Sequence, residues 1–296
     1  MTKTPASLEK LLADLIDYAG LFPPAKLDMN PAVEEYARQR QSDRRWMLAR
    51  FILPLGRLDE FIDAAADHFD GNPWPLSVLV AGDATEARRT IDAFNEAHRG
   101  RAAIEAVETR RDSPADIVTA GEALGGLSVF YELPHREPDL GPWMDAVAQA
   151  GGAAKIRSGG VTAEAFPSSE DVARFIAAAV DAGVPFKATA GLHHPLRGDY
   201  RLTYEPDSPT GTMHGFLNVF LTAAGLRSGI LDQAKAAELL EERSTDVTVE
   251  GDGLRWGDHH FSTAQLDDAR RHFALSYGSC SFAEPVEDLE TLGILT

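Results

Sequence analysis

Short apolar runs alternate with amphipathic segments along most of the chain. The runs end in Gly or Pro, and the segments between them have the apolar spacing of helices. Repeated units of this kind form a parallel sheet, because each helix returns the chain to the edge where the next strand begins. The sequence therefore predicts an α/β fold. The seven candidate strands are 15–22, 46–55, 76–82, 102–110, 127–134, 153–160 and 185–192.

An eighth strand would close these units into a barrel. The best candidate is 274–282, which a short helix follows at 284–292. Eight units predict a TIM (β/α)8 barrel, whose catalytic groups lie at the carboxyl ends of the strands. Residues 193–262 are too long for a plain crossover and contain a predicted hairpin that turns at 251–253. We interpret them as an insertion between strands seven and eight of one domain spanning 1–296. A doubly wound open sheet is the alternative architecture.

Charge and cysteine content restrict the partners and the compartment. The net charge of −18 disfavours nucleic acid and anionic membranes, because their phosphates would be repelled. No apolar run approaches the length that spans a membrane. The single cysteine, Cys280, cannot form an intramolecular disulfide and fits a reducing compartment. We therefore expect a cytoplasmic protein with a small-molecule ligand, and we leave a homo-oligomer open.

Two lysines lie in short apolar runs near predicted strand ends, Lys155 in AAKIRSGG and Lys187 in PFKATAGL. The chain has only six lysines against 22 arginines. The use of lysine at these two apolar positions therefore indicates a chemical role. On neighbouring strands, two ammonium groups in a medium of low dielectric constant lower each other's pKa. A neutral lysine can form a Schiff base with a carbonyl compound, and the iminium then draws electrons from an adjacent carbon–carbon bond. The alternative is that each lysine only pairs with a carboxylate.

Four carboxylates are candidates for general acid and base catalysis. Asp17 lies in the first predicted strand, where an unpaired carboxylate would be costly to bury. Glu105 and Glu108 belong to strand four, and Glu132 ends strand five. Strand parity puts Glu105 and Glu108 on opposite faces, so at most one points into the barrel. For each of the four, a plain salt bridge is the alternative role.

Polar side chains near the strand ends predict where an anionic carbonyl substrate binds. Arg157 and Thr189 each follow one of the two lysines by two residues, so each shares that lysine's strand face. Ser279 and Ser281 precede a predicted helix, whose backbone amides could help to hold an anion. Alternatively, these small residues only let the last strand close the barrel. The chemistry expected of the lysines needs no cofactor.

Histidines are concentrated after strand seven, where six of the nine occur. His193 and His194 directly follow that strand, and His214 comes 20 residues later. These three with an acid could hold a divalent metal, but their spacing matches no standard motif. We therefore predict no metal and prefer proton transfer or substrate contact as their role.

The strand ends, in order, read LIDYAGL, FILP, IEAV, FYEL, KIRSGG, KATAGL and GSCS. This series resembles the deoxyribose-phosphate aldolase family, class I aldolases on a TIM barrel, over scattered pieces of 15–192 and 277–282. The resemblance implies that Lys155 forms the Schiff base and that Lys187 perturbs its pKa. It also implies that Glu105 and Asp17 match the family's acids on strands four and one, and that GSCS helps to hold a phosphate.

Three departures from the family pattern weaken the match to its substrate. Arg157 replaces a small polar residue after the strand-six lysine, the strand-four acid is Glu instead of Asp, and the insertion has no counterpart in the family. We therefore expect a class I aldolase-type lyase that acts through Lys155 on a small oxo acid or sugar-like carbonyl compound. The alternatives are a metal-dependent hydrolase or lyase using the histidines, and a barrel that binds a small anion without converting it.

Overall fold

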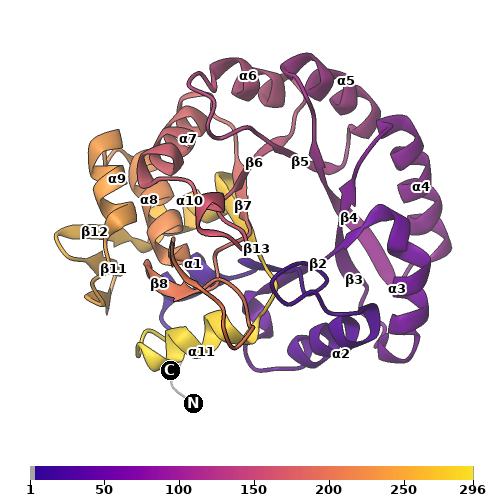
Figure 1. The fold of residues 1–296 in the computed structure, drawn as a ribbon, viewed down its shortest axis with the longest axis horizontal. Helices are drawn as coiled ribbons and strands as arrows, with labels where there is room; N and C mark the ends of the chain where they lie inside the picture. The colour runs from indigo at the N-terminus through magenta and orange to yellow at the C-terminus, as the bar shows by residue number, and fades with distance from the viewer. Residues whose placement is uncertain (1–3, 296) are drawn as a thin grey trace.

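Eight parallel strands form a closed barrel in the computed structural model, which describes residues 4–295 (Figure 1). The last strand pairs with both its neighbours and thereby closes the sheet. The TIM barrel predicted from the sequence is confirmed, and the doubly wound open sheet is excluded. The barrel strands are β1 (Ile16–Tyr18), β2 (Leu48–Pro54), β3 (Trp74–Val80), β4 (Ala102–Arg110), β5 (Ser128–Glu132), β6 (Ala153–Arg157), β7 (Phe186–Thr189) and β13 (Ala274–Ser279).

Helices surround the barrel because each one buries an apolar face against the strands. Ser113 and Ser168 cap two of these helices by accepting a backbone N–H with the side-chain oxygen, which defines where each helix begins. One helix, α1 (Ala6–Leu12), precedes the first strand. The helices between barrel strands are α2 (Met29–Arg40), α3 (Leu58–Ala65), α4 (Ala84–Ala97), α5 (Pro114–Leu124), α6 (Gly141–Gln149) and α7 (Ser169–Asp181), with short 3-10 turns at Arg45–Met47, Leu55–Arg57, Ala66–His68 and Ala163–Ala165.

The segment between β7 and β13 packs on one side of the barrel (Figure 1). The predicted hairpin is confirmed, and a third strand that the sequence pattern did not reveal extends it into a small antiparallel sheet. After the last barrel strand, α11 (Ala283–Thr291) follows. The elements of the segment are β8 (Gly198–Arg201), β9 (Thr210–Met213), α8 (Phe216–Ser228), α9 (Gln233–Glu241), β10 (Val247–Glu250), β11 (Gly253–Trp256), β12 (His259–Ser262) and α10 (Thr263–His272).

The barrel interior changes from apolar to charged along its axis. Ala106, Phe130 and Ala153 form a small apolar cluster between the strands. One step further along β6 and β7, Lys155 and Lys187 lie directly opposite each other in register. Because inward-facing residues alternate along a strand, this charged layer follows the apolar one toward the carboxyl ends of the strands.

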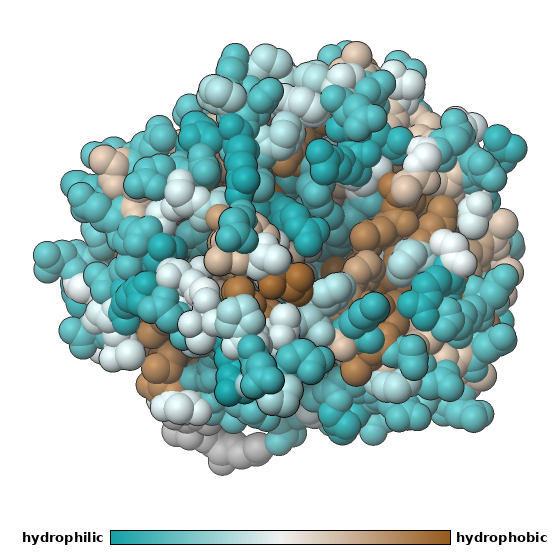
Figure 2. Space-filling view, in the orientation of Figure 1, coloured by the Kyte–Doolittle hydropathy of each residue, from teal (hydrophilic) through white to brown (hydrophobic). Residues whose placement is uncertain are grey.

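Hydrophilic side chains cover most of the face seen in Figure 2, and apolar groups gather near its centre. Between residues 4 and 295, no helix has both the length and the apolar character needed to cross a membrane.

The loops that follow β6 and β7 are held together tightly. Ser158 donates its backbone N–H to Thr189 O at 2.9 Å and its hydroxyl to Ala190 O at 2.7 Å. Gly191 has a φ of +75°, and a Cβ there would lie 2.7 Å from the Phe166 ring and 2.8 Å from the Gly159 Cα. Only glycine satisfies both the backbone conformation and this close approach.

We expect Gly191→Ala to destabilise the fold by about 2–4 kcal/mol, because it adds a steric overlap to the strain of a positive φ. Gly100→Ala is the matched control, since Gly100 has a φ of +82° and a Cβ added there would meet nothing within 4 Å. It should cost only about 1–2 kcal/mol. Urea unfolding of both variants measures the difference, and equal costs would contradict the packing argument.

Candidate active site

A cavity of about 200 Å³ opens at the carboxyl ends of the barrel strands. Several elements contribute its polar walls, because the carboxyl ends of all eight strands meet at this end of the barrel. The structure thus brings together most of the side chains that the sequence marked as candidates. Those that line the cavity are Glu108, Glu132, Lys155, Arg157, Thr189 and His193.

Lys155 lies between two carboxylates at the base of this cavity. Its Nζ is 3.0 Å from Glu108 Oε2 and 3.0 Å from Glu132 Oε2. The residue is 5% exposed, so the ammonium group reaches solvent only through the cavity. Such a group can touch a small molecule that enters the cavity.

Lys187 lies deeper, with no exposed surface. Its Nζ donates to Asp17 Oδ2 and to Glu108 Oε1, both at 2.6 Å. Glu108 therefore bridges the two lysines, one through each carboxylate oxygen. Both lysines belong to one charged cluster, as the strand parity predicts, but only Lys155 faces the open cavity.

Hydroxyl and backbone groups complete the partners of the buried carboxylates. Asp17 accepts from the Ser276 hydroxyl at 2.7 Å and from the Arg50 backbone N–H at 3.1 Å. Glu108 accepts from the Ser77 hydroxyl at 3.1 Å. These contacts fix the side chains, because a buried carboxylate is tolerated only when its oxygens are hydrogen-bonded or paired.

The pKa of Lys155 corrects the expectation that this lysine is neutral. Burial alone would lower that pKa, but the charges and hydrogen bonds of Glu108 and Glu132 raise it above its ordinary value. The same pairing works against burial at Glu108 and holds the pKa of its carboxyl far below the usual range. Repulsion between the two lysines, from which the neutral amine was expected, is outweighed by the carboxylates that lie between them.

Glu105 does not belong to this cluster, which corrects the position that the family resemblance implied for the strand-four acid. The pairing of β3 with β4 shifts at this point: Leu76 pairs with Ile104 and Ser77 with Ala106, so Glu105 is skipped as a bulge. Its side chain is 52% exposed and lies 3.9 Å from Arg50 Nε. The acid that strand four contributes beside Lys155 is Glu108.

His193, in the loop after β7, lines the cavity and contacts groups that the sequence did not mark as candidates. Its Nδ1 lies 3.2 Å from Glu284 Oε2 and 3.9 Å from Cys280 Sγ. Tyr204, from the loop between β8 and β9, donates its hydroxyl to Glu284 at 3.1 Å. Burial would lower the pKa of His193, but Cys280 and Glu284 raise it to about 9. The sequence feature that could have marked Glu284 as a site residue is its position in the first turn of the helix after the last strand.

The other two histidines do not converge with His193 on a metal site. His194 Nδ1 is 2.6 Å from Asp288 Oδ2, and its ring stacks on Tyr200. His214 Nε2 lies 2.8 Å from Pro167 O, and its Nδ1 lies 3.1 Å from an Arg197 nitrogen, so both ring nitrogens have partners away from the cavity. The histidine arrangement therefore does not favour the metal-dependent alternative.

Ser279 and Ser281 also turn to partners within the chain. The Ser281 hydroxyl accepts the backbone N–H of Glu284 at 3.2 Å, and the Ser279 hydroxyl accepts that of Ser281 at 3.4 Å. Neither side chain lines the cavity, although Gly278 and Cys280 beside them do. The predicted anion cradle is thus occupied by the chain's own groups.

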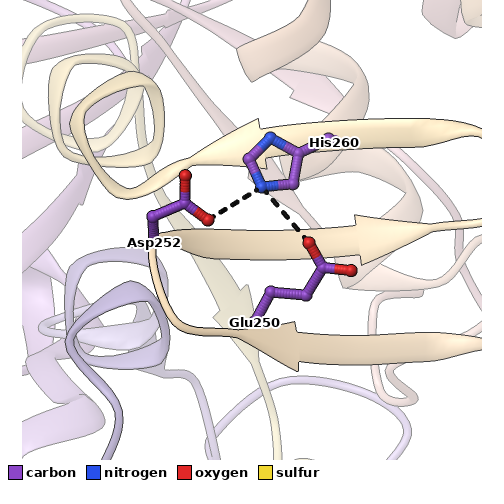
Figure 3. Close-up of side chains that lie close together, drawn as sticks. All are labelled: Glu250, Asp252 and His260. Carbon is purple, nitrogen blue, oxygen red and sulfur yellow. Dashed lines mark ion pairs between the residues drawn. The ribbon is translucent and has the colours of Figure 1, made fainter.

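A separate group of metal-type ligands lies on the sheet of β10, β11 and β12 (Figure 3). His260 Nε2 is 3.3 Å from Asp252 Oδ1 and 3.6 Å from Glu250 Oε2. Arg255 already pairs with both Glu250 oxygens, at 2.5 and 3.1 Å. A cation would have to compete with this guanidinium, so we assign no metal here.

A larger hollow of about 770 Å³ lies at the opposite, amino-terminal ends of the strands. Glu105 and Arg50 are among its lining residues, but neither lysine of the charged cluster is. Because the groups that carry chemistry in TIM barrels lie at the carboxyl ends, we take the smaller cavity as the candidate active site. The sequence matches no protein-family model and no curated protein, so the aldolase resemblance rests on the residues quoted above.

We expect Lys187→Met to destabilise the protein by about 3–5 kcal/mol, because it removes the buried cation from Asp17 and from one oxygen of Glu108 and leaves Asp17 only the part-exposed Arg50 guanidinium at 3.5 Å. Lys10→Met is the matched control: Lys10 pairs with Asp267 at 2.9 Å with 38% of its side chain exposed. It should cost less than about 1 kcal/mol. Denaturant unfolding compares the two, and a double variant Lys187→Met/Asp17→Asn should recover part of the loss.

The raised pKa of His193 predicts a pH dependence of stability. The protonated ring is stabilised in the folded state, so its contribution is complete below the unfolded value of 6.5 and disappears as the pH rises through about 9. The loss should be about 3 kcal/mol, since one pKa unit corresponds to about 1.4 kcal/mol. We expect His193→Gln to flatten the unfolding free energy between pH 6.5 and 9. His272→Gln, at a histidine whose side chain is 62% exposed, should leave the wild-type slope unchanged.

Proposed function

We propose that this protein is a lyase of the class I aldolase type, in which Lys155 forms a Schiff base with a small carbonyl substrate. The observation that carries the proposal is the position of Lys155, a buried lysine that lines a cavity at the carboxyl ends of the strands, where TIM barrels carry their catalytic groups. The carboxylates of Glu108 and Glu132 on either side supply the proton transfers that imine chemistry needs.

Imine formation begins with removal of a proton from the Lys155 ammonium. Glu132 is the acceptor in this proposal, because its Oε2 is 3.0 Å from Nζ and 18% of its side chain is exposed. Glu108 is a poorer proton acceptor, since its carboxylate is also paired with the Lys187 ammonium. The neutral amine then attacks the carbonyl carbon to give a carbinolamine. The protonated Glu132 returns its proton to the hydroxyl group, which leaves as water.

The iminium then accepts the electron pair of the neighbouring carbon–carbon bond. That bond breaks, an enamine forms, and the proton of the substrate hydroxyl passes to the Glu132 carboxylate. The product leaves as an aldehyde or ketone, and the enamine is protonated on carbon and hydrolysed to restore Lys155. His193, which lines the same cavity and is held by Glu284, can donate a hydrogen bond to a substrate oxygen.

Lys187 acts as a positioning residue in this mechanism. Its side chain has no exposed surface, so it does not touch the substrate. It holds one oxygen of Glu108 and leaves the other for Lys155. The orientation of the reactive amine therefore depends on a lysine that does not react.

We expect cyanoborohydride to reduce an imine between Lys155 and a small aldehyde or oxo acid, and mass spectrometry of peptides to find the adduct on Lys155. Lys155→Arg should abolish it, because a guanidinium keeps the charge beside Glu108 but does not form a stable imine. Lys235→Arg, at an exposed lysine of α9, should leave it unchanged. Glu132→Gln should slow labelling at pH 7 by about tenfold or more, because it removes the proposed proton acceptor.

The probes for this experiment are acetaldehyde, propanal, glyoxylate and pyruvate. Labelling of Lys155 no faster than that of Lys235 with every probe would contradict the Schiff-base proposal. Saturable binding of the same compounds without labelling would then favour a barrel that binds small anions without converting them.

A further inference from the structure

The cationic groups around the cavity differ in their protein partners. Lys155 is paired with two carboxylates, and His193 is paired with Glu284. Arg157 lines the cavity at the end of β6, yet its guanidinium has no ion pair or hydrogen bond with any group among residues 4–295. Arg157 therefore presents an uncompensated positive charge to whatever enters the cavity.

At the His193 side of the cavity, by contrast, the positive charge is already matched by the Glu284 carboxylate. The start of the helix after the last barrel strand is a common phosphate site in this fold, because its free N–H groups attract anions. Here the Glu284 carboxylate lies in the first turn of α11, held by His193 and the Tyr204 hydroxyl. Ser281 also accepts the Glu284 N–H. An internal carboxylate thus takes the place that a substrate phosphate would need.

We propose that the substrate is a short oxo acid, whose carboxylate binds the Arg157 guanidinium while its carbonyl group faces Lys155. This inference rests on the proposed Schiff-base function and names the substrate class for it. Arg157 and Lys155 are two residues apart on one strand face, about 7 Å along the strand. A single small molecule can therefore reach both side chains.

Charge balance favours a carboxylate over a phosphate. A carboxylate carries one negative charge, which the single unpaired guanidinium of Arg157 matches in a bidentate pair. A phosphate monoester carries about 1.5–2 negative charges at pH 7 and would lie near Glu132 without a second free cation. The size of the cavity agrees, since about 200 Å³ is below the range of drug-sized ligand pockets.

The test measures cyanoborohydride labelling of Lys155 against probe concentration in the wild type and in Arg157→Gln. The probes are glyoxylate, propanal and glycolaldehyde phosphate, which carry a carboxylate, no charge and a phosphate. Their intrinsic reactivities differ, so the informative quantity is the ratio of half-saturating concentrations between variant and wild type for each probe. Arg157 is exposed, and Arg157→Gln should fold normally, which thermal unfolding checks.

We expect Arg157→Gln to raise the half-saturating concentration of glyoxylate by about 10- to 100-fold, the effect of losing a charge-assisted pair. The half-saturating concentration of propanal should change less than about twofold, because propanal has no charged group that pairs with Arg157. Arg157→Lys should raise the half-saturating concentration of glyoxylate less than Arg157→Gln does, since lysine keeps the charge but not the two parallel donors of arginine. For glycolaldehyde phosphate, Arg157→Gln should raise the half-saturating concentration by a smaller factor than for glyoxylate. A ratio for the phosphate as large as that for glyoxylate, or equal ratios for glyoxylate and propanal, would overturn the proposal.

Binding of lactate separates this inference from the proposed chemistry, because lactate carries a carboxylate but no carbonyl group to react. Titration calorimetry should detect lactate in the wild type and about tenfold weaker binding in Arg157→Gln. If no probe labels Lys155 but lactate binding depends on Arg157, the Schiff-base function fails and the carboxylate site stands. If lactate binds equally to both proteins, or to neither, the carboxylate site fails whatever the labelling shows.

Discussion

Side chains of alternating charge form a row inside the barrel, near the carboxyl ends of its strands. In order, they are Asp17, Lys187, Glu108, Lys155 and Glu132. Taking these groups out of water is expensive, and well-packed apolar residues of similar volume would often stabilise a protein as well or better. The inward-facing layer below shows that this barrel can be filled with apolar side chains, namely Ala106, Phe130 and Ala153. Stability alone therefore does not explain the charges, whereas the chemistry that we propose at the cavity does.

In the proposed mechanism, the alternation of charges also explains how a protonated lysine can serve as a nucleophile. Lys155 is held as an ammonium group by two carboxylates, yet one of them, Glu132, is positioned to take the proton when a carbonyl compound arrives. The other, Glu108, stays ionised because Lys187 shares its charge. Two neighbouring carboxylates thus differ in exposure and in the number of lysines they pair with, and such a difference in environment is a recurring device for separating acid and base roles.

Much of this arrangement could be predicted from sequence, because local patterns encode it. Alternating apolar runs and helical segments predicted all eight barrel strands, and strand parity placed Lys155 beside Lys187. Parity could not decide between Glu105 and Glu108, because the bulge at Glu105 comes from the pairing of β4 with β3. The raised pKa of Lys155 depends on carboxylates from other strands. No local sequence pattern shows which of them approach the amine, so this pKa could not be predicted.

Hydrophobic periodicity predicts least about the segment after β7 and the last helix. These two parts of the chain supply the residues that meet at one side of the cavity. His193, Tyr204 and Glu284 come from three separate parts of the chain and meet only in the folded protein. Together they place a carboxylate that is already paired with His193 at the start of α11, so the anion that we propose to bind is left with Arg157 at the end of β6. In the proposed mechanism, the barrel strands thus supply the reactive amine, while the loops around them determine the charge that a substrate meets as it approaches.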